Sequence, residues 1–165
     1  MQRKLILIAH NLRSTHNIGS LLRTADGLGL ETVYLSGYTP YPKAKTDNRL
    51  PYMAEKIDRQ IVKTALGAEN MVHWEHVDDI GNLIADLKHL GYQIVAVEQT
   101  AAAQDLLEYQ PTAQVALIVG REVDGIEGEV LEMADKVVSI PMLGQKESFN
   151  VVQAAAMALF RLRFL

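Results

Sequence analysis

The segment 140–150 carries residue types suited to holding a small ligand at the start of a helix. It reads Ile-Pro-Met-Leu-Gly-Gln-Lys-Glu-Ser-Phe-Asn, so an apolar run that ends at a proline is followed by a glycine-containing loop. A helix with small residues in its early turns is expected next. Ser148 could contact a ligand through its hydroxyl, and it could equally cap the helix by accepting a backbone hydrogen bond. Both roles stay open.

A second candidate is the segment 120–128, Gly-Arg-Glu-Val-Asp-Gly-Ile-Glu-Gly, which also follows an apolar run. A phosphate-binding P-loop requires Lys and then Ser or Thr after its second Gly, whereas Ile126 and Glu127 stand here. The dinucleotide pattern Gly-x-Gly-x-x-Gly does not occur, and the carboxylates would repel a phosphate. We therefore expect a tight turn at the carboxyl end of a strand, where open α/β sheets bind ligands. A neutral or cationic ligand suits this turn better than a polyphosphate.

Arg23 is a third candidate, because it faces away from the apolar side of its own predicted helix. The apolar stripe of that helix ends at Gly29 and consists of Ile18, Leu21, Leu22, Ala25 and Leu28. At 100° per residue, Arg23 lies about 160° from the middle of the stripe. Taken alone, it is a solvated arginine. Asn17 precedes the first apolar residue, a position typical of a helix N-cap.

Composition and spacing exclude several other kinds of chemistry. The chain has no Cys, which excludes disulfides, thiolate zinc sites, iron–sulfur ligation and a cysteine nucleophile. His73 and His76 flank Glu75, but residues three apart on a strand point to opposite faces, so we expect no metal site. No Gly-x-Ser-x-Gly elbow supports a hydrolase triad. The net charge of −4 argues against nucleic-acid binding by bulk positive charge.

The alternation of apolar runs and helical patterns predicts the elements that position these residues. Short continuous apolar runs are typical of strands buried on both faces. The expected strands are Lys4–Ala9, Thr32–Ser36, Met71–Trp74, Gln93–Val97, Val115–Val119 and Lys136–Ile140. The expected helices cover about 18–28, 54–66, 79–89, 127–134 and 149 to the C-terminus. This order predicts an α/β fold, a mostly parallel sheet with helices on both faces, in one domain of residues 1–165.

The stretch 37–52 interrupts this alternation, because it is too rich in Pro, Tyr and polar residues for a core element. Loops of this length in a compact domain are usually functional or disordered. Residues 43–63 include six basic and three acidic side chains, a net charge of +3, so the rest of the chain carries −7. A solvated loop and helix face is one interpretation. The other is a surface that contacts phosphates and stacks on unpaired bases, in which six basic residues are interleaved with Tyr38, Tyr41 and Tyr52. The basic residues are Lys43, Lys45, Arg49, Lys56, Arg59 and Lys63.

The N-terminus begins with charged residues and continues with the five apolar residues Leu5 to Ala9. Secretion signals need about 7–15 apolar residues and a cleavage site, and a membrane span needs about 20. We therefore expect a cytoplasmic protein without a membrane segment.

Three separated blocks of the sequence resemble, in order and spacing, the motifs of the SpoU/TrmH family. The blocks are 17–26, 118–126 and 140–151, and the similarity covers nearly the whole chain. The members of this family are RNA ribose 2′-O-methyltransferases of the SPOUT class. The resemblance implies a C-terminal trefoil knot, S-adenosylmethionine bound at the knot without a metal, and a homodimer. General topology rules disfavour knots, so this expectation depends on the resemblance alone.

The resemblance also implies what the substrate is and where it binds. The substrate is RNA, and a compact chain favours tRNA over ribosomal RNA. We expect no separate RNA-binding domain before Asn17, which leaves RNA recognition to the dimer surface and to residues 38–63. Residues expected to contact RNA are Arg13, Arg23, Lys43, Lys45, Arg49 and Lys146.

Individual roles follow from the same resemblance. The expected catalytic residues are Arg23, Ser148, Asn150, Asn17 and Glu122. The residues expected to hold the cofactor are Glu98, Gln99, Thr100, Val119, Gly120, Glu122, Ile140, Met142, Ser148, Phe149 and Asn150. Phe149 departs from the pattern, since Leu is usual between Ser and Asn. This departure changes the shape of the pocket more than its chemistry.

Physical chemistry limits how such a site works. A sulfonium methyl is already activated, so the enzyme must mainly align the 2′-oxygen and stabilise charge as the hydroxyl loses its proton. A guanidinium stays protonated, so Arg23 is a poor base. We expect Arg23 to pair with an RNA phosphate or the developing alkoxide, while the phosphate or Ser148 assists deprotonation. Two alternatives remain open: a knotted RNA-binding or assembly factor without transfer activity, and a base-nitrogen methyltransferase of the same fold.

Overall fold

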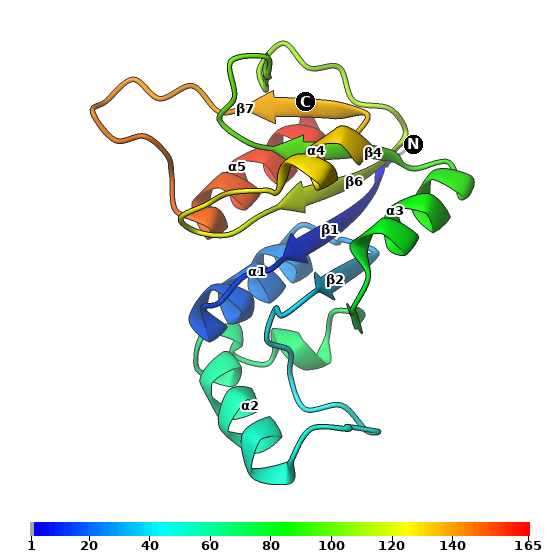
Figure 1. Ribbon diagram of the computed structural model, residues 1–165, viewed down its shortest axis with the longest axis vertical. Coiled ribbons are helices and arrows are strands. Elements are labelled where there is room, and N and C mark those ends of the chain that lie inside the picture. Colours follow the sequence, from blue (N-terminus) through cyan, green and yellow to red (C-terminus); the bar gives the residue numbers. More distant parts are fainter. Residues whose placement is uncertain (1) are drawn as a thin grey trace.

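The computed structural model describes residues 2–165, which form a parallel sheet with helices on both faces (Figure 1). The seven strands of this part of the chain lie in the order β3-β2-β1-β6-β4-β7-β5. They are β1 (Lys4–His10), β2 (Thr32–Ser36), β3 (Trp74–Val77), β4 (Gln93–Val97), β5 (Gln104–Asp105), β6 (Gln114–Val119) and β7 (Lys136–Ser139). Because neighbouring strands are parallel, their carboxyl ends meet at one edge of the sheet. The predicted α/β class and mostly parallel sheet are confirmed.

The helices divide between the two faces of the sheet. They are α1 (Thr15–Gly27), α2 (Pro51–Ala65), the short 3₁₀ helix η1 (Ala68–Asn70), α3 (Ile80–His89), α4 (Gly128–Met133) and α5 (Val151–Phe164). The core on one face joins β1 to α1 and α5, with α2 packed against α1, and the core on the other face joins β1 to α3 and α4. Within residues 2–165, none of the helices combines the length and the apolar character that a membrane crossing requires.

Strand β1 shows how the sequence specifies this arrangement. Leu5 and Leu7 belong to the core beneath α1 and α5, whereas Ile6 and Ile8 belong to the core beneath α3 and α4. Successive side chains of a strand point to opposite faces, so a strand covered on both sides needs an apolar residue at every position. This is why β1, β4 and β6 appear in the sequence as continuous apolar runs.

The weakest strands differ from the expectation. The strand expected at 71–74 is wrong, because β3 covers Trp74–Val77 and Met71 is 77% exposed. As an edge strand, β3 is only partly buried, so it has no continuous apolar run. The two-residue β5 was not expected at all, since Gln104 and Asp105 carry no strand pattern.

Three helices begin at residues other than those expected. Ser14, and not Asn17, caps α1, because its hydroxyl accepts the backbone N–H of Asn17 at 3.2 Å. Asn150, and not Ser148, caps α5, because its side-chain oxygen accepts the N–H of Val152 at 2.9 Å. Helix α2 begins at Pro51 rather than at residue 54, and proline suits the first turn of a helix. The side chains of Asn17 and Ser148 are therefore not committed to capping.

Candidate functional site

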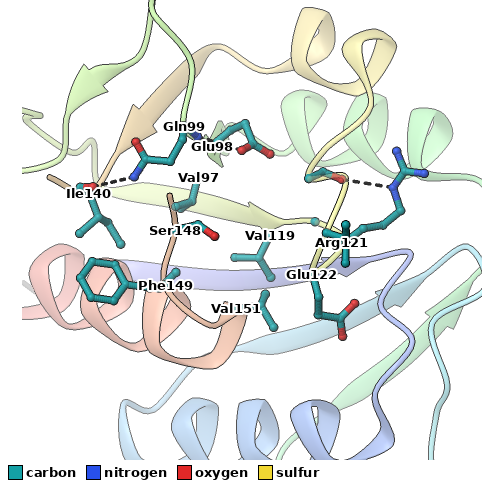
Figure 2. A pocket seen from close by; sticks show the side chains of 14 residues that line it. Val97, Glu98, Gln99, Val119, Arg121, Glu122, Ile140, Ser148, Phe149 and Val151 are labelled. Carbon is teal, nitrogen blue, oxygen red and sulfur yellow. Dashed lines mark hydrogen bonds between the residues drawn. The ribbon is translucent and has the colours of Figure 1, made fainter. Parts of the chain in front are cut away.

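A pocket opens at the carboxyl edge of the sheet, where the ends of β4 and β6 meet the segments that follow β7 and precede α5 (Figure 2). It is lined by Val97–Gln99, Val119–Val123, Gly125, Ile140, Ser148, Phe149, Val151 and Ala154. The three strand-end segments near residues 98, 120 and 140 therefore lie around one cavity. They come from strands that are neighbours in the sheet but far apart in the sequence.

The lining combines an apolar side with acidic groups. Figure 2 shows Ile140 and Phe149 at one end of the pocket and Arg121 and Glu122 at the other. The Arg121 guanidinium is committed to its own loop, because its Nε donates to the carbonyl of Gly125 at 3.3 Å and its Nη1 lies 3.6 Å from Asp124. The pocket is thus suited to an apolar ring and to a neutral or cationic group.

Glu98 fixes the turn that follows β6. Its two carboxylate oxygens accept the backbone N–H groups of Ile126 and Gln99, each at 2.8 Å. Gly125 has a φ of +69°, and a Cβ at this position would lie 2.2 Å from a Glu98 carboxylate oxygen. Glycine is required here for both reasons. The side chain of Gln99 donates to the carbonyl of Ile140 at 2.7 Å, which ties the end of β4 to the segment after β7.

Glu122 connects the pocket to the N-terminus of α1. One oxygen of its carboxylate accepts hydrogen bonds from the Asn17 side-chain amide at 3.1 Å and from the Ser14 N–H at 3.3 Å. The other oxygen accepts the N–H of Arg13 at 3.4 Å. A carboxylate is favoured at a helix N-terminus, where N–H groups and the helix dipole face it. Residues 105 positions apart in the sequence therefore meet at the rim of the pocket.

Arg23 lies apart from the pocket formed by its own chain. It follows Asn17 by six residues, which on a helix corresponds to about 9 Å along the axis and a rotation of about 240°. The side chain is exposed, as the stripe of apolar residues on α1 predicted. Among residues 2–165, Arg23 is not part of the pocket lining.

Residues 4–160, which include every strand of the sheet, match the sequence model of the SpoU rRNA Methylase family. The chain belongs to this family.

Relatives within the SpoU family act on RNA according to their names. The chain is 31% identical over 159 residues to a tRNA (guanosine(18)-2′-O)-methyltransferase of Aquifex aeolicus (strain VF5), covering 96% of the chain and 68% of that protein. It is 31% identical to the 23S rRNA (guanosine-2′-O-)-methyltransferase RlmB of Neisseria meningitidis, covering 96% of the chain and 58% of that protein. A crystal structure of the A. aeolicus TrmH/SpoU tRNA modifying enzyme superposes with a TM-score of 0.79 and 29% identity, over 98% of this chain and 74% of that one.

Most of the residues that the SpoU resemblance assigned to the cofactor line the pocket. They are Glu98, Gln99, Val119, Gly120, Glu122, Ile140, Ser148 and Phe149. Within the described part of the chain, Thr100, Met142 and Asn150 do not line it. The Asn150 side chain caps α5 by accepting the N–H of Val152. Thr100 follows Gln99 in the sequence and its side chain is exposed.

The residue assignment also missed several lining positions. Val97, Arg121, Val123, Gly125, Val151 and Ala154 contribute to the pocket and were not named. Val97, Arg121, Val123 and Val151 are adjacent to a named position and Gly125 is in the turn that contains Glu122, so the motif boundaries were the available signal for these five. Ala154 lies inside α5, one helical turn after Asn150. A strand end or a tight turn brings consecutive residues to one cavity.

Arg49 requires a correction among the residues expected to contact RNA. Its guanidinium donates to Asp47 at 2.9 and 2.5 Å and to the carbonyls of Tyr41 and Pro42 at 2.9 and 3.1 Å. These contacts use its donors inside the loop, so Arg49 organises the loop rather than facing RNA. The hydrogen bond from Arg49 also holds the pKa of the Asp47 carboxyl far below its usual value. Arg13, Arg23, Lys43, Lys45 and Lys146 are exposed.

A largely buried polar network, which the sequence did not reveal, contacts the loop 120–127 that lines the pocket. His10, at the end of β1, lies with Nδ1 2.7 Å from the Ser36 hydroxyl and with Nε2 3.3 Å from the Glu127 carboxylate. The Asn11 side-chain amide donates to Glu127 at 2.8 Å and lies 3.0 Å from His10 Nε2. Glu127 is in turn 3.6 Å from Arg121 of the pocket loop. The network joins the ends of β1 and β2 to the turn after β6.

This network predicts a loss of stability at mildly acidic pH. Burial lowers the pKa of His10 below 6.5, opposed by the Glu127 carboxylate and assisted by Arg121. The folded chain therefore binds a proton at His10 less readily than the unfolded chain, so the free energy of unfolding falls as the pH drops below 6.5. Urea titrations at pH 7.5, 6.5 and 5.5 measure this dependence in the wild type and in His10→Gln. The wild type is expected to lose more stability than the variant, and parallel profiles would contradict the role of His10.

Proposed function

We propose that this chain transfers a methyl group from S-adenosylmethionine to a ribose 2′-hydroxyl of RNA, with tRNA the favoured substrate. The observation that carries the proposal is the Glu122 carboxylate, which holds Asn17 and the N-terminus of α1 at the rim of a pocket that Ser148 also lines. Residues from three separated motifs are thereby gathered at one site. The names of the relatives, tRNA and 23S rRNA guanosine 2′-O-methyltransferases, support the same activity.

The chemistry of the pocket fits S-adenosylmethionine. Val119, Ile140 and Phe149 provide apolar surface for an aromatic ring, while strand-end peptide groups lie around them. The carboxylate of Glu122 suits a ligand that carries positive charge and no phosphate. When bound, the cofactor supplies an activated methyl group. We infer that Gln99, Gly120 and the apolar side chains hold it.

The residues of the chain then have to orient the ribose and remove the proton of its 2′-hydroxyl. Glu122 fixes the amide of Asn17 at 3.1 Å and so sets the position of the α1 N-terminus beside the pocket. As the 2′-hydroxyl gives its proton to the Ser148 hydroxyl, Ser148 can release its own hydroxyl proton to an RNA phosphate and so remains neutral. The guanidinium of Arg23 stabilises negative charge on the 2′-oxygen or binds the adjacent phosphate.

Two copies of the chain pair through α5 in this proposal. Met157, Phe160 and Phe164 form an apolar stripe on the outer face of α5, and the two Phe side chains are 54% and 60% exposed with ring centroids 4.9 Å apart. Contiguous exposed apolar surface is typical of an interaction site. Helix α1 packs beside α5, so a partner docked on α5 approaches the outer face of α1. Arg23 would then serve the pocket of the partner.

A C-terminal trefoil knot is also part of the proposal. Two features support it: the interleaved strand order β6-β4-β7-β5, and the segment 140–150, which leads from β7 back across the ends of β4 and β6 to α5. In Figure 1 this segment forms a wide loop before it enters α5. A threaded return of this kind would explain why the turns after β4, β6 and β7 meet in one pocket.

Calorimetry and nucleoside analysis test the proposed activity. S-adenosylmethionine is titrated into the protein, and the protein is then incubated with the labelled cofactor and unmodified tRNA or ribosomal RNA. We expect one cofactor site per chain and a ribose-methylated nucleoside in tRNA, identified by mass spectrometry. A folded protein that binds no cofactor would favour an RNA-binding factor. A methylated base would favour the base-nitrogen methyltransferase.

A further inference from the structure

A second groove lies beside β3, the edge strand on the far side of β1 from β4. It runs between the loop 41–48, which follows β2, and the edge strand β3, with Asp58 of α2 and Glu69 and Asn70 of η1 at its base. In Figure 1 this loop is the cyan segment that extends below β2 before the chain enters α2. None of the residues of the proposed methyl-transfer site lines this groove.

One wall of the groove is a cluster of flat rings. Trp74, the single tryptophan of the chain, is partly exposed, and its indole N–H donates to the carbonyl of Glu69 at 3.1 Å, which fixes its orientation. The Tyr41 ring lies 6.3 Å from Trp74 and 4.1 Å from His76, measured between centroids. The Arg49 guanidinium stands 3.6 Å from the Tyr41 centroid. Tyr41 is thus covered by its neighbours, and Trp74 is the ring that can stack on a ligand.

The opposite wall is held rigid before any ligand arrives. Arg49 binds Asp47 and two carbonyls of its own loop, and the backbone N–H of Ala44 donates to Asp47 at 3.1 Å. The Lys43 backbone N–H donates to Asp58 at 2.8 Å, which fastens the loop to α2. A wall that is already ordered loses little conformational entropy when a ligand binds.

Charged groups of both signs line the groove: the carboxylates of Asp58, Glu69 and Glu75, and the ammonium groups of Lys43 and Lys45. Each carboxylate that lines it accepts a hydrogen bond from a neighbour: Asp58 from Lys43, Glu69 from Gly67 and Asn70, and Glu75 from His73. Lys43 pairs with Glu55 at 3.3 Å, whereas Lys45 forms no ion pair within the described residues. The groove therefore offers an aromatic face, the side-chain amide of Asn48 and, at Lys45, one ammonium group without an ion pair, beside three carboxylates that neighbouring N–H groups hold in place.

We propose that this groove binds an unpaired nucleobase of the substrate RNA, stacked on Trp74, with Lys45 on the adjacent phosphate. A nucleotide joins a flat ring to one negative charge, and Trp74 and Lys45 are the two groups of the groove that complement these parts. The loop leaves the sheet at the carboxyl end of β2, the edge at which the first pocket opens, whereas Trp74 is the first residue of the parallel strand β3 and lies at its amino end. An RNA that occupies both sites therefore has to extend across the sheet. The inference rests on the proposed function, because it names where the substrate of that reaction is held.

Fluorescence of Trp74 provides a direct test, since the chain has no other tryptophan. The protein, saturated with S-adenosylmethionine, is titrated with an unmodified tRNA transcript and with a short single-stranded oligoribonucleotide. We expect quenching with both, and a fall in affinity as salt is raised. For Lys45→Ala we expect about a threefold to tenfold weaker affinity and a salt slope smaller by about 1. Lys136→Ala, at the amino end of β7, is the matched control and should behave like the wild type.

Anisotropy of labelled RNA extends the test to Trp74 itself. Trp74→Leu is expected to weaken RNA binding about tenfold or more, whereas Trp74→Phe keeps a stacking ring and should retain most of the affinity. Cofactor titration checks that each variant is folded and that the first pocket is intact. RNA binding without a change in Trp74 fluorescence, equal affinities of Lys45→Ala and Lys136→Ala, or no RNA binding at all would overturn the inference. Methyl transfer without quenching defeats this inference alone, and quenching without methyl transfer defeats the proposed reaction alone.

Discussion

Replacing Gly19 by Ala is expected to lower the free energy of unfolding by about 3 kcal/mol or more. Gly19 lies in α1 where this helix crosses α2. A Cβ at residue 19 would lie 2.1 Å from the Thr64 hydroxyl, 2.3 Å from the carbonyl oxygen of Ile61 and 2.7 Å from the backbone nitrogen of Ala65. Two of these atoms belong to the backbone of α2, so no change of rotamer relieves the contact. The helices must move apart, and the core between them loses packing.

Gly27→Ala provides the matched control for this prediction, because it makes the same chemical change in the same helix. A Cβ at residue 27 meets nothing within 4 Å. Alanine is favoured over glycine in helices by roughly 0.5–1 kcal/mol, so the control should be neutral or slightly stabilised. For Gly19→Ala, thermal unfolding should show a Tm lower by about 6–12 °C, since each kcal/mol shifts Tm by about 2–4 °C at this size. Equal Tm values for the two variants would contradict the close approach of α1 and α2.

The central part of the fold was predictable because it is buried on both faces. Strands β1, β4 and β6 require apolar residues at every position, so their runs appear directly in the sequence, and the structure confirms them to within one residue at each end. The edge of the sheet gives no such signal. Trp74 was placed at the end of a strand and is in fact its first residue, because the apolar Met71 and Val72 before it lie in a turn.

Helix caps were less predictable because several residues near each helix start can accept a backbone hydrogen bond. Serine and asparagine are both favoured as caps. The backbone is extended at Ser14 and already helical at Asn17, so Ser14 is the cap of α1. The same holds for Ser148 and Asn150 before α5. These outcomes matter for function, because the residue that does not cap remains free. Because Asn17 does not cap the helix, its side-chain amide donates to Glu122, and Ser148, which likewise does not cap, lines the pocket.

Long-range polar contacts were beyond sequence reasoning altogether. Asn11 and Glu127 are 116 residues apart and form one hydrogen bond, and no local pattern connects them. Arg49 illustrates a local signal that was missed. It follows Asp47 by two residues, and a buried pair of this kind removes a basic residue from the surface. Because Arg49 and Asp47 carry opposite charges, their pairing leaves the net charge of +3 over 43–63 unchanged and removes one basic side chain from those that can contact a ligand.

Arg23→Ala is expected to reduce methyl transfer by about 100- to 1,000-fold without weakening cofactor binding, if the proposed reaction holds. The loss follows from the removal of a fixed positive charge beside the 2′-oxygen. Cofactor binding is preserved because Arg23 is outside the pocket lining of its own chain. Arg23→Lys should recover little activity, because an ammonium group lacks the planar set of donors that a guanidinium presents. Single-turnover assays with tRNA and calorimetry with the cofactor measure the two quantities, and wild-type rates for the Lys variant would contradict a role for guanidinium geometry.

Mixed dimers decide which pocket Arg23 serves. Ser148→Phe places a bulky ring at an exposed position of the pocket, so it should block the cofactor without disturbing the core. Neither Arg23→Ala nor Ser148→Phe is expected to be active alone. If Arg23 acts in the partner's pocket, a mixed dimer combines one intact pocket with one intact Arg23, and re-equilibrated equal mixtures should recover about a quarter of wild-type activity. If Arg23 acts in its own chain, the mixture stays inactive, because every pocket then carries one of the two defects. The exposed position of Arg23, about 9 Å along α1 from Asn17, favours the first outcome.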